Sequence, residues 1–76
     1  MERVLEILKS VRDDIDYENE KSLVDDGILD SFDIVGIVSE LIEEYEIEIT
    51  INDMTSDNFN NVEAIYAMVN RLLEEI

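Results

Sequence analysis

Three stretches of this chain place apolar residues at every third or fourth position, and this helical spacing constrains the fold more than any other feature of the sequence. It predicts a first helix over roughly residues 2 to 13, a second helix from Ser31 to Tyr45 and a last helix that follows Asn60. The letters "TSDNF" add a short helical turn before the last helix. The sequence therefore predicts an all-α fold, a small bundle of three main helices plus one short helix, with residues 1–76 forming one domain.

The apolar side of each helix marks the predicted core. On the first helix these residues are Val4, Ile7, Leu8, Val11 and Ile15. On the second helix they are Ile34, Val35, Ile37, Val38, Leu41, Ile42 and Tyr45, and the opposite polar side holds Asp33, Gly36, Ser39, Glu40, Glu43 and Glu44. On the last helix they are Val62, Ile65, Val69, Leu72 and Ile76, with Met68 and Leu73 beside them. One apolar residue breaks the pattern, because Phe32 falls on the polar side.

The helix starts carry capping residues. Asp30 precedes the second helix, and its carboxylate can accept hydrogen bonds from the free amides of the first turn. Asn60 is predicted to cap the last helix, with Glu63 three residues later completing a pattern like a capping box.

Two loops complete the predicted fold. The acidic segment "DYENEKSLVDDG" offers Leu23 and Val24 as anchors into the core. The segment "EIEIT" alternates like a strand but has no partner strand, so we predict an extended loop in which Ile47, Ile49 and Ile51 face inward.

The charge balance narrows the classes of partner. Five Lys and Arg stand against 21 Asp and Glu, a formal net charge of −16. Nucleic-acid binding needs a basic footprint, so it is not expected, whereas partners with basic patches are. The chain has no cysteine, and "MERVLEILKSVRDD" lacks the apolar run of a signal peptide or membrane span. We therefore expect a soluble, cytoplasmic protein, and a monomer because like charges repel.

The sequence argues against an independent enzyme. An acyl-transferring serine needs a base within hydrogen-bond reach, and the chain has no histidine. Lys21 is a conceivable base, but no sequence feature places it beside Ser31. The segment "DDIDYENE" resembles a calcium loop, yet counting from Asp14 it has Asn19 where that loop needs glycine and Asp25 where it needs glutamate. No metal site is predicted.

The surface around Ser31 is the strongest candidate site. Ser31 opens the second helix, Phe32 leaves an apolar side chain beside it, and the same helix carries the acidic strip Asp33, Glu40, Glu43 and Glu44. Each feature has a plain explanation: a helix start, a phenylalanine folded under the loop at 25–29, a solvated face. Together they indicate a docking surface around a modifiable hydroxyl.

These residues resemble the acyl carrier protein family of phosphopantetheine-binding carriers. "DGILDSFDIVGIVSELIEEYEIEI" resembles the family's signature loop and second helix, and "TSDNFNNVEAIYAMV" resembles its short third helix and the start of its fourth. The resemblance runs from about Leu23 to the end, and the first helix agrees only in pattern. It implies that Ser31 is the attachment site for 4′-phosphopantetheine, with Asp30 part of that cofactor site.

The resemblance also implies partners and a mode of action. A phosphopantetheinyl transferase would add the arm from coenzyme A. A loading ligase would then attach an acyl or aminoacyl group as a thioester, and an acyltransferase or synthase would consume it. The implied partner contacts are Phe32, Asp33, Glu40, Glu43 and Glu44. The chain itself would be a non-catalytic carrier.

The sequence departs from the family pattern in places. Phe32 replaces the usual leucine, Gly36 and Ile42 stand where the fatty-acid carriers show acidic residues, and Glu46 stands where many relatives have glycine after the helix. "GILDSFD" is more similar to discrete carriers of specialised pathways, D-alanyl carriers included. Two alternatives stay open: an acidic protein-interaction module that does not need Ser31, and a divalent-cation sensor.

Overall fold

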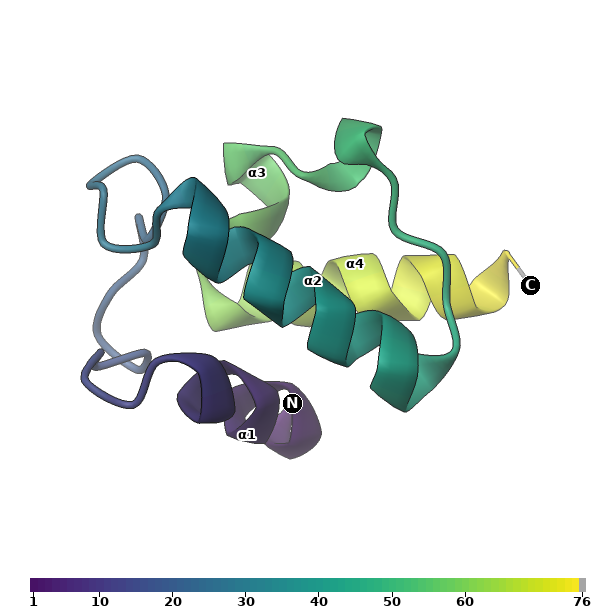
Figure 1. Cartoon of the computed structure of the whole chain (residues 1–76), viewed down its shortest axis with the longest axis horizontal. Coiled ribbons are helices and arrows are strands. Elements are labelled where there is room, and N and C mark those ends of the chain that lie inside the picture. Colours follow the sequence, from purple (N-terminus) through teal and green to yellow (C-terminus); the bar gives the residue numbers. More distant parts are fainter. Residues whose placement is uncertain (76) are drawn as a thin grey trace.

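The computed structural model describes residues 1–75, and within them the chain is all-helical, as the sequence predicts (Figure 1). Its elements are α1 (Glu2–Val11), α2 (Ser31–Tyr45), the 3-10 helix η1 (Ile51–Asp53), α3 (Ser56–Phe59) and α4 (Val62–Glu74). The helix α1 packs against α2 and α4, and the short α3 packs against the start of α4. None of the helices in residues 1–75 is both long enough and apolar enough to cross a bilayer.

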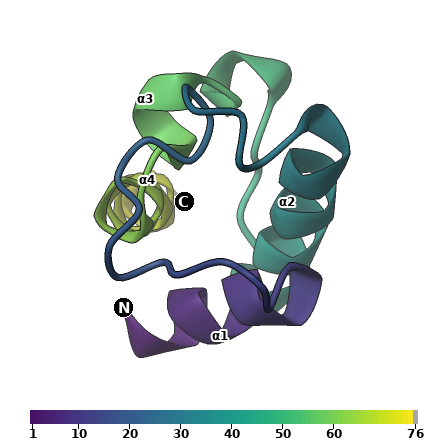
Figure 2. The ribbon, with the colours of Figure 1, turned by 90° about the vertical axis from the view of Figure 1, so that its left-hand side faces the viewer.

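The core lies between the long helices, which surround it when the molecule is viewed along α4 (Figure 2). Each long helix buries the apolar residues that recur every three or four positions: Val4, Ile7 and Leu8 on α1, Ile37, Val38 and Leu41 on α2, and Val62, Ile65, Met68, Val69 and Leu72 on α4. The loop between α1 and α2 crosses the end of the bundle at which α2 begins (Figures 1 and 2).

The helix α1 ends earlier than predicted, at Val11 rather than near residue 13. Arg12 is extended, with φ −139°, so Ile15 packs on the core from the loop. The stop is stabilised by the buried Tyr17, whose hydroxyl lies 3.0 Å from the Leu8 carbonyl oxygen and 2.7 Å from that of Arg12. Burial raises the pKa of Tyr17 to about 12, which keeps the hydroxyl a donor to these helix-end carbonyls.

The loop before α2 is anchored at both of the predicted residues and at two more. Leu23 is fully buried and Val24 packs against the core, while Tyr17 and Leu29 are also buried. The Leu23 amide donates to the Asn60 carbonyl oxygen, and the Leu29 amide donates to the Leu23 carbonyl oxygen, at 2.8 Å each. These bonds fix the point at which the chain enters α2.

The buried side of α2 is narrower than the sequence predicts. Val35 is 59% exposed and Ile42 is 37% exposed, although both were expected in the core. Asp33, expected on the exposed side, is buried. Helices α1 and α4 cover only one side of α2, and Val35 and Ile42, seven residues apart, share a direction outside that cover.

The segment after α2 follows the predicted alternation only in part. Ile47 and Ile49 are buried, but the prediction for Ile51 is wrong, because Ile51 is 82% exposed. The chain turns into η1 at Ile51, and a helical turn ends the two-residue period that would have carried Ile51 inward.

The prediction that Asn60 caps the last helix is also wrong by one residue. The N-cap of α4 is Asn61, whose Oδ1 accepts from the Ala64 amide at 2.8 Å. Asn60 instead ends α3, and its side chain binds the loop before α2. Glu63 pairs with Lys21 at 2.8 Å rather than completing a box, and Leu73 is partly exposed. Ile76 lies outside the described residues.

Candidate functional site

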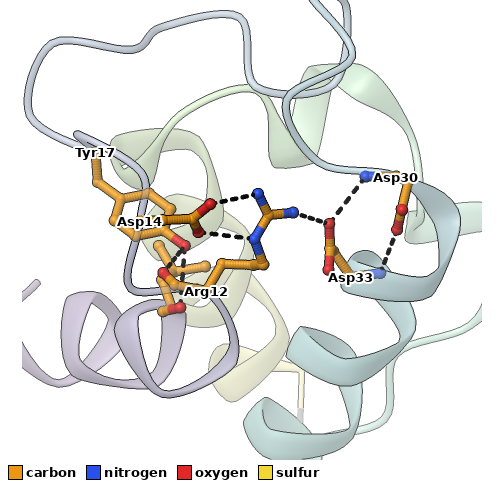
Figure 3. A network of polar contacts seen from close by, with 6 residues as sticks. Arg12, Asp14, Tyr17, Asp30 and Asp33 are labelled. Carbon is orange, nitrogen blue, oxygen red and sulfur yellow. Dashed lines mark hydrogen bonds and ion pairs between the residues drawn. The ribbon is translucent and has the colours of Figure 1, made fainter.

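Ser31 is the first residue of α2 and is exposed, at the end of the bundle where the α1–α2 loop delivers the chain. Asp30 is the N-cap, as predicted, and its Oδ1 accepts from the Asp33 amide at 2.8 Å. The Asp33 carboxylate in return accepts from the Asp30 amide at 3.2 Å, which completes a capping box (Figure 3). The serine therefore sits between two residues that bind each other.

Asp33 is buried, at 7% exposed, and its charge is compensated by a residue from outside α2. Arg12, just beyond the end of α1, places Nη1 2.6 Å from Asp33 Oδ2. The same guanidinium holds Asp14 with two further bonds, Nε to Oδ1 at 2.8 Å and Nη2 to Oδ2 at 3.0 Å (Figure 3). These hydrogen bonds, to Asp14 first and then to Asp33, raise the pKa of Arg12, and the bonds from Arg12 lower the pKa of Asp14.

Sequence reasoning missed this role of Arg12 and placed Asp33 on the solvated face. One signal was available, because an acidic residue three positions after an N-cap Asp is the spacing of a capping box. Nothing in the spacing of residues 12 and 33 points to their contact, since it depends on how the loop between them folds.

Phe32 is 85% exposed, so it does not fold under the loop at 25–29. Val35 and Ile42 are exposed on the same helix, and their spacing from Phe32 places all three toward the outer side of α2. The surface beside Ser31 is therefore apolar as well as acidic. Gly36 instead faces α1, since a Cβ at this position would meet Val11 Cγ1 at 3.4 Å.

The acidic strip divides into free and paired carboxylates. Glu40 and Glu43 are exposed on α2, and no ion pair of the described residues involves them. Glu44 pairs with Arg3 across α1 and α2 at 2.6 Å, and this hydrogen bond lowers the pKa of Glu44. The structure thus brings Asp30, Ser31 and Asp33 together at one helix start, while Asp33 and Glu44 are already engaged within the chain.

Two other candidate sites were considered in the sequence, a Lys21 base for Ser31 and a metal site. Lys21, considered as a base, pairs with Glu63. Among residues 1–75, no group of three or more His, Cys, Asp or Glu side chains is arranged to hold a metal ion.

A small acidic helical bundle that exposes a serine at the capped start of its second helix has the architecture of a carrier domain. The chain is 43% identical over 77 residues to the D-alanyl carrier protein of Bacillus mycoides (strain KBAB4), covering 99% of this chain and 92% of the relative. It is 42% identical, with the same coverage, to the D-alanyl carrier proteins of Bacillus cereus (strain B4264) and Bacillus anthracis (strain CDC 684 / NRRL 3495).

No family model matches the chain, and no solved structure matches it. The relatives nevertheless cover nearly the whole chain at well over 30% identity, and the chain therefore belongs to the acyl carrier protein family of phosphopantetheine carriers. The resemblance inferred from the sequence around Ser31 is confirmed at the level of the family.

Proposed function

We propose that this chain carries D-alanyl groups on a 4′-phosphopantetheine arm attached to Ser31. The observation that carries the proposal is an exposed serine at the capped start of α2 in a chain that matches D-alanyl carrier proteins over nearly its whole length. The proposal treats residues 1–76 as one non-catalytic carrier domain that works in the cytoplasm, where coenzyme A is found.

The residues at the start of α2 fit a phosphodiester. The first amides of a helix have no partner within the helix, and the helix dipole favours negative charge there. The Asp33 amide donates to Asp30 Oδ1. The amides of Ser31 and Phe32 come earlier in the first turn of α2 and therefore have no partner within the helix. Of the two nearby carboxylates, Asp33 is compensated by Arg12, whereas Asp30 is exposed and repels a phosphate. We therefore expect an arm that is attached but not bound along its length.

The chain's own contribution to the attachment is the Ser31 hydroxyl oxygen and its position. The sequence has no histidine, and we propose that a base of the transferase that supplies the arm removes the proton of that hydroxyl. The attached arm ends in a thiol, which supplies the thioester linkage for an acyl group.

The charge of the chain suits an aminoacyl cargo. A D-alanyl group held through its carboxyl carbon keeps a free ammonium, and the net charge of −16 attracts a cation. A fatty acyl group would gain nothing from this field. The electrostatics therefore support an aminoacyl cargo over an apolar one.

Partner enzymes would meet the surface beside Ser31. We propose that Phe32 supplies the apolar contact, and that Glu40 and Glu43 supply acidic contacts to basic patches. That Asp33 and Glu44 also contact partners stays a prediction, and both carboxylates would first have to leave their arginines. The partners are the phosphopantetheinyl transferase, a loading ligase for D-alanine and a downstream acyltransferase.

The test is intact-mass measurement in two stages. Wild type and Ser31→Ala are incubated with coenzyme A and a broad-specificity phosphopantetheinyl transferase, with a known carrier labelled in parallel. We expect a gain of one phosphopantetheine in wild type only. The modified chain is then offered D-alanine, L-alanine and a fatty acid, each with a matching ligase and ATP, and we expect loading with D-alanine. Failure of the first stage would leave an acidic interaction module without a prosthetic group, and failure of the second would overturn the cargo alone.

A further inference from the structure

We propose that Arg12 is a positioning residue for the modification of Ser31, acting from outside α2 through the buried carboxylate of Asp33. This inference rests on the proposed function of Ser31. Arg12 follows the last residue of α1, and the loop of residues 13–30 separates it from α2. Its guanidinium therefore ties the end of one helix to the start of the next (Figure 3).

The guanidinium is oriented before it reaches Asp33. Asp14 binds it through both carboxylate oxygens, at 2.8 Å and 3.0 Å, and this two-point contact fixes the plane of the group. The remaining nitrogen, Nη1, is then directed at Asp33 Oδ2 at 2.6 Å. A lysine has no planar fork and cannot make both contacts in this geometry.

Asp33 Oδ2 has two donors, Arg12 Nη1 and the Asp30 amide. The residue is buried, and a buried carboxylate without its counter-charge is strongly unfavourable. Loss of Arg12 would drive Asp33 toward water and break its bond to the Asp30 amide. One half of the capping box would then open, and Ser31 lies between the two residues of that box.

Arg12 also offsets the negative charge of Asp33 close to the serine. The phosphate donor of the transferase reaction is anionic, and an uncompensated Asp33 would repel it. Both effects act on the same step, so we expect loss of Arg12 to slow the modification of Ser31 by about tenfold or more.

Arg3 provides a matched control, because it makes the equivalent contact at the other end of the same helix pair. It pairs with Glu44 at 2.6 Å, also between α1 and α2, and it touches no member of the capping box. Arg3→Gln and Arg12→Gln each remove one positive charge and one ion pair between these helices. Only Arg12→Gln disturbs the start of α2.

The experiment measures kcat/KM of the transferase for wild type, Arg3→Gln, Arg12→Gln, Arg12→Lys and Asp33→Asn, with the melting temperature of each. We expect Arg12→Gln to be slowed most. Asp33→Asn should be slowed less, because it adds no uncompensated charge and keeps a side-chain oxygen that can accept from the Asp30 amide. Arg12→Lys should recover part of the rate, and Arg3→Gln should match wild type. Adding Arg12→Gln to Asp33→Asn should cost nothing further, because the two residues act as a pair. Amide exchange at Asp30, whose N–H donates to Asp33 Oδ2, should speed up in Arg12→Gln and stay unchanged in Arg3→Gln.

Three outcomes would overturn the inference. Equal rates for Arg12→Gln and wild type would show that the serine needs no support from α1. Equal slowing by Arg3→Gln would show a general effect of charge or stability. An unmodified wild type beside a labelled control carrier would remove the function of Ser31, and the inference with it. If Arg12→Gln does not fold, the comparison of Arg12→Lys with Arg3→Lys decides by the same criteria.

Discussion

Arg3 Nη2 lies 2.6 Å from Glu44 Oε1, which joins the first turn of α1 to the last turn of α2. The chain has only five basic residues against 21 acidic ones. Three of the five, Arg3, Arg12 and Lys21, form ion pairs with carboxylates of another segment. These few basic residues thus act as internal counter-ions that join the elements of the bundle. We therefore expect the loss of one of them to destabilise the fold more than the loss of the carboxylate with which it pairs.

The first prediction compares the two halves of that ion pair. Arg3→Gln removes a counter-ion and deepens the self-repulsion, so we expect the melting temperature to fall by about 2–5 °C at low salt. Glu44→Gln breaks the same pair but relieves repulsion, so its melting temperature should fall less or rise. Differential scanning calorimetry at 20 mM and 1 M NaCl checks this, because salt should shrink the difference. Equal losses at low salt would contradict it.

The second prediction concerns two neighbouring asparagines with different structural roles. Asn60 Oδ1 accepts from the amides of Val24 and Asp25 at 3.0 and 3.1 Å, whereas Asn61 Oδ1 caps α4. Asn60→Ala leaves two loop amides without a partner and should lower the free energy of unfolding by about 1–3 kcal/mol. Asn61→Ala should cost about 1 kcal/mol.

Amide exchange separates these two variants, with urea unfolding giving their stabilities. Asn60→Ala should speed exchange at Val24 and Asp25, and Asn61→Ala should speed it at Ala64. The same exchange pattern in both variants would mean that the two side chains stabilise one cooperative unit, rather than the loop before α2 and the start of α4 separately.

The helices and their buried sides could be predicted because they depend on local spacing. The burial of one side of α1 and of α4 follows directly from apolar residues at helical intervals, and Asp30 is a favoured cap residue by its type and position alone. Asn60 and Asn61 are both acceptable caps in the sequence. The choice between them depends on the amides of Val24 and Asp25, which come from far along the chain.

The candidate site could be predicted in its exposed parts and not in its buried ones. Ser31 and Phe32 are exposed for a local reason, because helical spacing places them away from the apolar residues that α2 buries. The engagement of Asp33 and Glu44 depends on arginines outside α2, one within α1 and one just beyond its end, and the spacing within α2 contains no information about them. Val35 and Ile42 are exposed because neighbouring helices do not reach them, which is again a property of the packing.

The third prediction concerns the end of α2. Glu46 is the C-cap and has φ 54° and ψ 40°, in the left-handed region that favours glycine. Glu46→Gly relieves that conformation and removes a negative charge from a helix C-terminus, so it should raise the free energy of unfolding by about 0.5–1 kcal/mol. Glu46→Gln removes only the charge and should raise the free energy of unfolding by less. Urea unfolding of the three proteins checks the order, and equal gains for both variants would assign the effect to charge alone.

The fourth prediction tests the partner surface. Reversing Glu40 and Glu43 to lysine should slow modification and loading by about tenfold or more at low salt, because basic patches on the partners would then be repelled. Glu74 and Glu75 are exposed at the far end of α4 and give a matched reversal with the same change in net charge. Transfer rates at several salt concentrations check this, with circular dichroism confirming the helices. Equal slowing by both pairs would mean that net charge matters and position does not.

The fifth prediction concerns pH and follows from two effects of opposite sign. Ion pairs lower the pKa values of Asp14, Glu44 and Glu63 below their ordinary values of 3.8 for Asp and 4.5 for Glu. A group whose pKa is lower in the folded chain stabilises the fold above its unfolded pKa, and this stabilisation is lost as the pH falls through the folded value. These pairs therefore hold at neutral pH and fail only below about pH 4.

Self-repulsion changes over a higher range, because the net charge of −16 declines as the pH approaches the isoelectric point of about 4.1. We therefore expect the melting temperature to rise from pH 8 to about pH 5 and to fall below about pH 4, where the ion pairs are lost. Thermal unfolding at low salt across this range checks the profile. In 1 M NaCl the rise should flatten because screening replaces titration, and in Glu63→Gln the acid loss should be shallower. A melting temperature that stays flat from pH 8 to about pH 5 and falls only below about pH 4 would show that the ion pairs, and not the surplus of negative charge, dominate the stability of this bundle.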